Sequence, residues 1–433
     1  MAKIQVKQWK NIPLADKDKI FKRSEQNIDD VLEAAQEIID RVKKDGDKAL
    51  LHFNEKFIGL NPHHNYLKVS KNEFIEAEKN LTNEVKEAIR FSVDNITKFH
   101  NAQKTESMTM METIPGVFAG ERATPIDSVG LYVPGGRGTF PSMLYMLAVP
   151  AVIAGVKKIC VTTPPNKKGC ADSGVLYACS LCGITDVFKT GGAQAIAALT
   201  YGTKTIKPVV KILGPGSKWV TAAKRLLYSA VDVGLPAGPS ESALIADSSA
   251  NPYNMALDLL VEAEHGSDSS ALLLTDNNGL AEKAVSYMEA MIEDLPEPRK
   301  TFVTDVLQGY GGVIVTKDIN EACEISNKYA PEHLSLHTKD PWDTMGKITN
   351  AGEIILGDST PFSAVNYSVG PNAVLPTGGK AKTFSAVGVR DFIKYSSVIY
   401  STKKGYDQLS KHVPVLAEYE GFTTHGNAFK LRK

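Results

Sequence analysis

The chain has 433 residues, more than one hydrophobic core usually supports, so the sequence predicts two or more domains. Its composition, 43% hydrophobic and 23% charged, excludes a disordered chain. Lys plus Arg equals Asp plus Glu at 49 each, so net charge provides no attraction to nucleic acid. The first residues lack the apolar core of a signal peptide, and the most apolar run, 143–156, is too short to span a bilayer. We expect a cytoplasmic protein that binds neither nucleic acid nor membrane.

The first hundred residues show the apolar spacing of helices, first in a segment that Asn27 caps and Gly46 ends and then over roughly 71–103. Residues 112–124, ETIPGVFAGERAT, change to short apolar runs broken by Pro and Gly, which predicts a hairpin leading into the main sheet. The five cysteines are an odd number in a long chain and do not suggest a disulfide framework. Cys179 and Cys182 form a C-x-x-C within a helical apolar pattern, where buried small residues are favoured over a redox or metal motif.

From 129 to 240 the chain alternates short strands with helices, which predicts a parallel sheet covered on both faces. Gly-rich turns follow the strands at 135–136, 191–194 and 214–216. Ligands of such sheets collect at the carboxyl ends of the strands, so these turns are candidates for a nucleotide site. None matches G-x-G-x-x-G, and the turns could equally serve only to close strand–helix joints.

A second alternating region follows, with strand patterns in SALIAD, SALLLTD, GGVIVTKD, HLSLHT and GEIILGD. The two regions indicate an α/β fold of two similar parallel-sheet domains. The tail after Val387 has helical parts and no alternating sheet pattern. We expect it to be an appendage that packs on the body or on a partner chain.

Residues 251–265 predict a helix that could carry half of a metal site. Asn251 suits the cap, Pro252 suits the first helical position and Gly266 supplies the stop. Glu262 and His265, three residues apart in the last turn, can direct a carboxylate and an imidazole toward one ion. A solvated pair is the simpler alternative.

Four other polar clusters are candidates for chemistry: residues 237–241, residues 329–333, Asn366 with Tyr367, and His425. Glu332 and His333 are adjacent at the start of a strand and would point to opposite faces unless the backbone turns there, which Pro331 makes reasonable. A surface pair and a general acid–base pair both remain open at this point.

The ordered motifs of the whole chain resemble those of the histidinol dehydrogenase family. They run GLYVPGG, GGAQAIAAL, GPG, PAGPSE, AEHG, PEHL, GPN-x-VLPTGG and a final His. The resemblance implies a zinc- and NAD-dependent enzyme that oxidises an alcohol to an aldehyde and then to an acid. It also implies an intertwined homodimer whose subunits contain two incomplete Rossmann-like domains with small extensions.

On this basis we expect four parts. Residues 1–26 would be an N-terminal extension, and 27–131 together with 240–387 would form the zinc and catalytic domain. Residues 132–239 would form the cofactor-side domain, and 388–433 would be a C-terminal extension intertwined with the partner.

The resemblance also implies roles for single residues. Glu332 and His333 would be the acid–base pair, with His333 taking the alcohol proton and Glu332 activating water for the aldehyde step. The implied zinc ligands are Glu262, His265, Asn366 and His425, the last from the tail of the other subunit. The other implied contacts are Tyr132, Gln194 and Ser217 for NAD, and Ser240, Glu420, His425 and Ser142 for the substrate.

The chain departs from the family pattern near this site. Glu262 replaces a Gln and Asn366 replaces an Asp, so one carboxylate and one amide are kept and zinc binding is still expected. Ala373 replaces a His that contacts substrate, and Ser217 replaces the Asn of GPGN. These changes question the identity of the alcohol more than the reaction. One alternative is a paralogue that turns over L-histidinol poorly and prefers another amino alcohol or polyol; Arg137 could suit an anionic one or be an ordinary surface charge. The other alternative is an inactive binding homologue.

Overall fold

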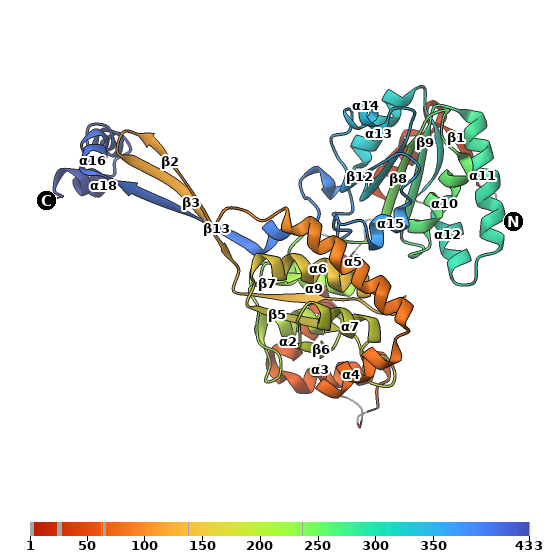
Figure 1. Ribbon diagram of the computed structural model, residues 1–433, viewed down its shortest axis with the longest axis horizontal. Helices are drawn as coiled ribbons and strands as arrows, with labels where there is room; N and C mark the ends of the chain where they lie inside the picture. Colours follow the sequence, from red (N-terminus) through yellow and green to blue (C-terminus); the bar gives the residue numbers. More distant parts are fainter. Residues whose placement is uncertain are drawn as a thin grey trace.

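The computed structural model describes residues 4–23, 28–61, 63, 66–136, 138–235, 237–309 and 311–432. The chain forms two lobes, each built on a parallel sheet, and an arm that stands away from both (Figure 1). We call them the six-stranded lobe (4–23 and 237–367), the four-stranded lobe (28–101 and 128–235) and the arm (108–125 and 393–432). The predicted α/β class with two parallel sheets is confirmed.

The six-stranded lobe has strand order β1-β10-β9-β8-β11-β12, with every neighbouring pair parallel. Its strands are β1 (Val6–Gln8), β8 (Glu241–Ala246), β9 (Ser270–Thr275), β10 (Gly312–Val315), β11 (His333–His337) and β12 (Glu353–Leu356). Its helices are α1 (Leu14–Lys22), α10 (Pro252–Ala263), α11 (Asn278–Glu293), α12 (Arg299–Gln308), α13 (Ile319–Tyr329), α14 (Pro341–Met345) and α15 (Phe362–Tyr367), with η1 (Trp9–Asn11) after β1.

The central strands β8 and β9 are buried along their whole length because both faces of the sheet are covered. Leu273 of β9 packs in one buried cluster with α10 and α11, and its neighbour Leu272 packs in another with α13. Successive side chains of a strand point to opposite faces, so a strand buried on both sides needs apolar residues at nearly every position. The predicted strands of this region are therefore confirmed.

The four-stranded lobe has strand order β6-β5-β4-β7, again all parallel. Its strands are β4 (Ser128–Tyr132), β5 (Lys158–Thr163), β6 (Val187–Lys189) and β7 (Lys211–Leu213). Its helices are α2 (Leu32–Asp45), α3 (Asp47–Ile58), α4 (Lys71–Asn80), α5 (Asn83–Asn101), α6 (Pro141–Ala154), α7 (Ser173–Leu181), α8 (Gly192–Tyr201) and α9 (Lys218–Leu227), with η2 (Asp29–Val31) before α2.

The N-terminal helices belong to a different lobe from the one expected. Ile39 and Val42 of α2 pack with Ile196 and Leu199 of α8, so this segment covers the four-stranded sheet rather than joining residues 240–387. Residues 6–8 are likewise no separate extension, because β1 pairs with β10 at the edge of the six-stranded sheet. An amphipathic stripe predicts that a helix is half-buried but not which sheet it covers, and this explains the difference.

The arm is a three-stranded antiparallel sheet of β2 (Met108–Ile114), β3 (Val117–Pro125) and β13 (Ile393–Ser401), capped by α16 (Lys403–Leu409), α17 (Val413–Tyr419) and α18 (Thr423–Lys430). The short η4 (Lys380–Lys382) and η5 (Val389–Phe392) precede β13. The predicted hairpin is confirmed, and the tail adds the strand β13 although its sequence has no alternating sheet pattern. All nine residues of β13 are exposed or half-buried, so burial imposes no polar–apolar alternation on it.

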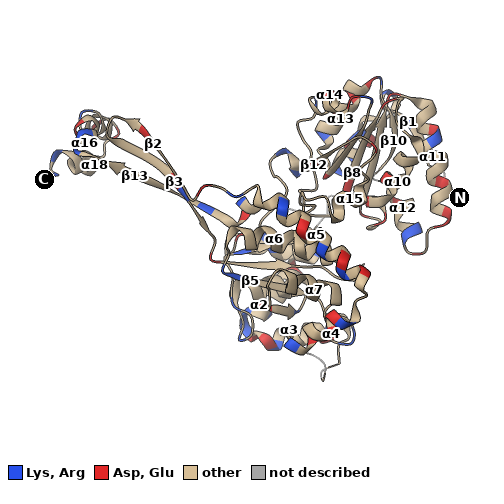
Figure 2. Ribbon diagram, in the orientation of Figure 1, with Lys and Arg blue, Asp and Glu red and all other residues tan. Residues whose placement is uncertain are grey.

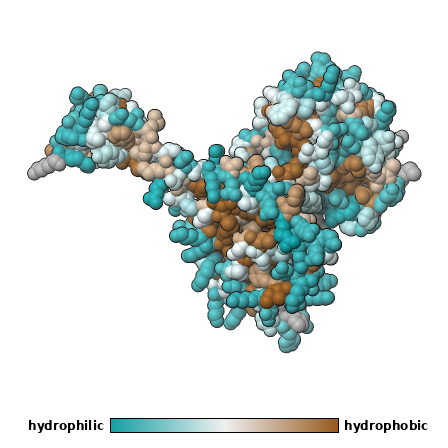
Figure 3. All heavy atoms as spheres, viewed as in Figure 1, coloured by the Kyte–Doolittle hydropathy of each residue, from teal (hydrophilic) through white to brown (hydrophobic). Residues whose placement is uncertain are grey.

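The sheet of the arm carries few charged residues (Figure 2), and its surface includes apolar side chains (Figure 3). Within the described ranges, no helix has both the length and the apolar character needed to cross a lipid bilayer.

Candidate active site

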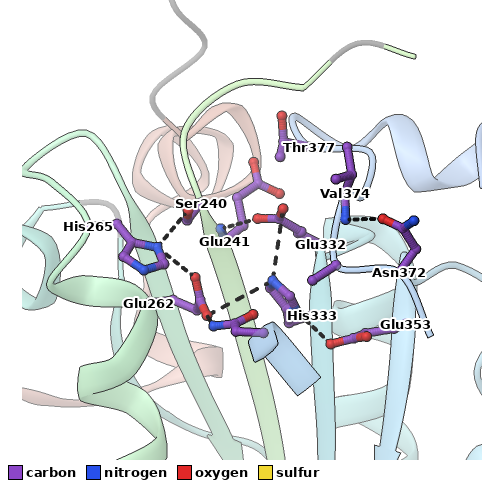
Figure 4. Close-up of polar contacts among 12 residues, drawn as sticks. Ser240, Glu241, Glu262, His265, Glu332, His333, Glu353, Asn372, Val374 and Thr377 are labelled. Atoms are coloured by element: carbon purple, nitrogen blue, oxygen red, sulfur yellow. Dashed lines mark hydrogen bonds and ion pairs between the residues drawn. The ribbon is translucent and has the colours of Figure 1, made fainter. Parts of the chain in front are cut away.

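The candidate site lies where β8, β11 and β12 begin, next to the end of α10 and beside α15 (Figure 4). Helix α10 forms as predicted: the Asn251 side chain accepts a hydrogen bond from the Tyr253 amide, and Pro252 is its first residue. Glu262 lies in its last turn and is 1% exposed. His265 follows just after the helix ends, yet its Nδ1 lies 3.0 Å from Glu262 Oε2. The predicted pairing of these two side chains is present.

Asn366 joins this pair from α15. Its Nδ2 donates to Glu262 Oε1 at 2.6 Å, and the Tyr145 hydroxyl of the four-stranded lobe donates to the carbonyl of the adjacent Tyr367 at 3.0 Å. The second contact ties the end of α15 to the other lobe. Three of the four implied zinc ligands therefore converge within one subunit.

The electrostatics of Glu262 suit a cation. Burial alone would raise the pKa of Glu262, but the neighbouring His265 and His333 lower it to about 2. For His265 burial acts to lower the pKa, and the Glu262 carboxylate raises it overall. Glu262 Oε2 is buried, and its nearest polar neighbour is His265 Nδ1 at 3.0 Å.

A carboxylate, an imidazole and an amide are nitrogen and oxygen donors of the kind that bind zinc. In the part of the chain that the structure describes, no three His, Cys, Asp or Glu side chains gather as a metal site. The implied set includes an amide, which is not one of those residue types, and His425, which lies on the arm. Glu262, His265 and Asn366 therefore fit zinc, and His425 would be the fourth ligand.

Glu332 and His333 both face this cluster. Ala330 adopts a left-handed backbone with φ +51°, and β11 begins only at His333, so the chain turns before the pair as the sequence suggested. His333 Nε2 lies 3.9 Å from Glu332 Oε1 and 3.9 Å from Glu262 Oε1. The two side chains are thus close enough to share one substrate.

Burial raises the pKa of Glu332 well above its ordinary value. Burial acts in the opposite direction on His333, but the carboxylates of Glu262, Glu353 and Glu332 together raise its pKa to about 10. Ionisable groups with strongly shifted pKa values beside one another are typical of acid–base chemistry.

Glu332 is hydrogen-bonded to the backbone of Glu241, whose side chain forms a buried ion pair. The Glu241 amide donates to Glu332 Oε2 at 2.9 Å, while the Glu241 side chain binds Arg23 Nη1 at 2.7 Å. The adjacent Ser240, predicted to contact substrate, places its hydroxyl 2.9 Å from His265 Nδ1. Ser240 therefore lies at the cluster.

The residues expected to bind NAD lie at the carboxyl ends of strands in the four-stranded lobe. Tyr132 ends β4, and its hydroxyl accepts a hydrogen bond from the Gly192 amide at 3.2 Å. Gln194 is buried in the first turn of α8, and Ser217 is the residue directly before α9. Ser142 lies in the first turn of α6 and is half-buried. Arg137 lies outside the described residues.

Two expected site residues are not at the cluster in this chain. Glu420 follows α17 and His425 lies on α18, both exposed at the end of the arm, which extends away from the two lobes (Figure 1). Ala373, where the family has a histidine, packs against the core of the four-stranded lobe and offers no polar side chain.

Sequence reasoning did not single out Arg23 or Glu353. Arg23 follows α1, more than 200 residues before its partner Glu241. Glu353 was recognised only as part of a strand, and its Oε1 lies 2.5 Å from His333 Nδ1. A charged residue at the first position of an otherwise apolar strand was the one available signal for Glu353.

Oxidation of an alcohol requires a base for the hydroxyl proton and an acceptor for the hydride. The buried His333 beside Glu332, together with the glycine-rich strand ends of a Rossmann-like lobe, defines an NAD-dependent dehydrogenase acting on an alcohol. A sequence model of the histidinol dehydrogenase family matches residues 21–433, and the chain belongs to this family.

Named relatives agree over nearly the full length. A histidinol dehydrogenase of Synechocystis is 50% identical over 416 residues, covering 96% of each chain. A histidinol dehydrogenase homolog of Colwellia psychrerythraea is 45% identical and covers 98% of this chain and 96% of its own. The crystal structure of histidinol dehydrogenase from Elizabethkingia anophelis matches with a TM-score of 0.94 at 36% identity, covering 100% of this chain and 98% of that one.

Enzymes of this family oxidise histidinol to histidine in two NAD-dependent steps and use zinc. The expected family, reaction class and cofactors are confirmed.

Proposed function

We propose that this chain oxidises L-histidinol to L-histidine through the aldehyde, with Glu332 and His333 as its acid–base pair. The observation that carries the proposal is the convergence of this pair with Glu262, His265 and Asn366 at one place, although the three segments lie far apart in the sequence. A protein that only bound a metal or a nucleotide would need neither Glu332 nor His333.

In the first oxidation His333 Nε2 takes the hydroxyl proton while the carbon gives up its hydride to NAD. In the second, Glu332 takes a proton from the water that adds to the aldehyde carbon, and the resulting hydrate gives up its hydride to a second NAD. The hydrogen bond from the Glu241 amide holds the Glu332 carboxylate in place for this step.

Zinc would be held by Glu262, His265 and Asn366 together with His425. When bound there, the ion would polarise the substrate oxygen, and its charge would offset part of the carboxylate charge that keeps a proton on His333. The buried Glu262 carboxylate, with His265 at one oxygen and Asn366 at the other, supports this assignment.

We also propose that two copies exchange arms, so that Glu420 and His425 reach the site of the partner. Both residues are exposed on an arm that points away from its own site. The arm exposes many apolar side chains, which a second copy would cover. They include Met108, Met111, Tyr395, Ile399, Tyr400, Val415, Leu416, Tyr419 and Phe422.

Subunit mixing tests the exchange. His333→Asn and His425→Ala are each expected to be inactive, but unfolding and refolding them together at equal amounts would form mixed dimers. If arms cross, one of the two sites of each mixed dimer is intact, and activity recovers to about a quarter of the wild-type value. If each arm instead contributed His425 to the site of its own subunit, no mixture of the two variants would recover activity.

NAD reduction by the zinc-loaded protein tests the reaction itself. With L-histidinol we expect a kcat/KM of about 10⁴ M⁻¹s⁻¹ or more, the ordinary range for an enzyme with its own substrate. A panel of amino alcohols and diols serves as the comparison, and a value for L-histidinol far below that of another member would reject it as the substrate.

A paralogue with another alcohol is the second candidate, and the surroundings of Ala373 favour it. A methyl group there cannot supply the hydrogen bond of the family's histidine, and an unmet buried bond costs about 1–3 kcal/mol. Ala373→His separates the two candidates. It should raise kcat/KM for L-histidinol in a paralogue and leave it nearly unchanged in an enzyme already adapted to L-histidinol.

A further inference from the structure

The ring of His333 is held on its far side by a second carboxylate, that of Glu353. Glu353 Oε1 lies 2.5 Å from His333 Nδ1, and the side chains are 11% and 3% exposed respectively. Figure 4 shows Glu353 beneath the imidazole, on the side opposite Glu332. The two ring nitrogens therefore face different groups: Nδ1 faces Glu353, and Nε2 faces Glu332 and Glu262.

The backbone brings this carboxylate to its position. Strands β11 and β12 are parallel and pair His333 with Glu353, and the Glu353 amide donates to the Glu332 carbonyl at 3.0 Å. Gly352 permits the approach, because a Cβ at that position would lie 2.4 Å from the Glu332 carbonyl oxygen. The backbone of Glu353 is thus hydrogen-bonded to the segment that carries Glu332 and His333.

The face of the ring is fixed as well. Phe362 is fully buried at the start of α15, and its ring meets the imidazole edge-on, with centroids 6.0 Å apart and planes at 71°. With Phe362 at its face and Glu353 at Nδ1, the His333 ring has little freedom to rotate.

From this geometry we propose that Glu353 is a positioning residue for the alcohol oxidation: it accepts the Nδ1 proton of His333 and so leaves Nε2 as the base. The inference rests on the proposed function of His333. In the step itself the O–H bond of the alcohol breaks and an N–H bond forms at Nε2, while the hydride goes to NAD. The Nδ1 proton stays on His333, where the Glu353 carboxylate accepts its hydrogen bond.

A carboxylate beside an imidazole acts mainly by fixing which ring nitrogen carries the proton, and its charge alone matters less. Without an acceptor at Nδ1 the proton can move to Nε2, and that nitrogen then no longer takes a proton from the substrate. A purely structural tie between β11 and β12 would instead affect stability and leave the rates nearly unchanged.

Three variants separate these possibilities. We expect Glu353→Gln and Glu353→Leu to lower kcat for L-histidinol by about 100-fold or more, with KM for alcohol and NAD within about threefold. Glu353→Asp keeps the charge on a shorter side chain and should recover at least about tenfold over Glu353→Gln.

Asn327→Ala is the matched control for the docking of β12. Asn327 accepts from the Thr349 amide at 2.7 Å and donates to the Lys347 carbonyl at 2.8 Å, so it anchors the loop that leads into β12 without touching His333. It should lower the melting temperature and leave kcat nearly unchanged. Equal losses of kcat in Asn327→Ala and Glu353→Gln, or a wild-type kcat in Glu353→Gln, would overturn the proposal.

A measurement on the unmodified sequence covers the case in which the variants fail to fold. A hydrogen bond as short as 2.5 Å should give a far-downfield proton resonance, coupled to a ring nitrogen in histidine-labelled protein and lost in His333→Asn. Its absence from the wild-type protein would refute the pairing. If the resonance is present but the wild type does not oxidise L-histidinol, the proposed substrate fails and the positioning of His333 by Glu353 stands.

Discussion

The buried pair of Arg23 and Glu241 gives the sharpest stability prediction. Their side chains are 2% and 6% exposed, and Nη1 and Oε2 lie 2.7 Å apart. The guanidinium also stacks 3.5 Å from the centre of the Tyr329 ring and donates to the Tyr329 carbonyl. Glu241 Oε1 accepts from the Gly378 amide at 2.7 Å. The pair therefore joins the N-terminal segment, β8 and the loop after α15.

Replacing Arg23 with Met removes the positive charge and leaves the Glu241 carboxylate buried. Breaking one side of a buried pair typically costs 3–5 kcal/mol, and because Glu241 keeps the Gly378 amide we expect about 3 kcal/mol. Adding Glu241→Gln removes the stranded charge and keeps an acceptor for that amide. The double variant should recover about half of the loss or more.

Urea denaturation of the wild type, both single variants and the double variant provides the measurement. The same set should be assayed for aldehyde oxidation, because the Glu241 amide holds Glu332. If Arg23→Met costs under about 1 kcal/mol, or if the double variant is no more stable than that single variant, the ion pair does not have the energetic role assigned to it.

Three further predictions concern the site. Glu262→Gln should weaken zinc binding roughly 5- to 150-fold, and adding Asn366→Asp, which restores one carboxylate and one amide, should recover it; metal analysis showing no recovery would contradict the exchange. His333→Asn should lower alcohol oxidation by about 10²–10⁴-fold, whereas Glu332→Gln should mainly lower aldehyde oxidation; separate assays giving equal losses in both steps would rule out the division. Tyr132→Phe removes the acceptor of a backbone amide in the glycine-rich turn and should raise KM for NAD about fivefold with kcat nearly unchanged; an unaltered KM would exclude Tyr132 from the cofactor site.

The sequence predicted the sheets well because their strands are buried on both faces. SALLLT of β9 is apolar at almost every position, and such runs between helical patterns have few other interpretations. Strand β13 had no such signal, since its side chains face solvent on both sides of the arm. The lobe of α2 could not be predicted either, because its apolar stripe would suit any apolar surface.

The sequence predicted those residues of the candidate site that lie in short motifs. Glu262, His265, Glu332 and His333 lie in short, chemically distinctive stretches, and the structure brings them together. Glu353 lies 20 residues from His333, and only the register of β11 and β12 makes them neighbours. Pairing across strands is a property of the fold, which no local pattern in GEIILGD contains.

The pairing of β1 with β10 has a consequence for how the chain folds during its synthesis. Val6 lies opposite Val313, so the first strand leaves the ribosome long before its partner exists. At ordinary translation rates of about 5–20 residues per second, the separation of 307 positions (313 − 6) takes roughly 15–60 s to synthesise. During that interval the four-stranded lobe can begin to fold while residues 6–23 remain a tether without their native contacts. Nascent chains stalled near residue 300 should thus be cleaved by protease within this tether, and chains released after β10 has formed should resist it.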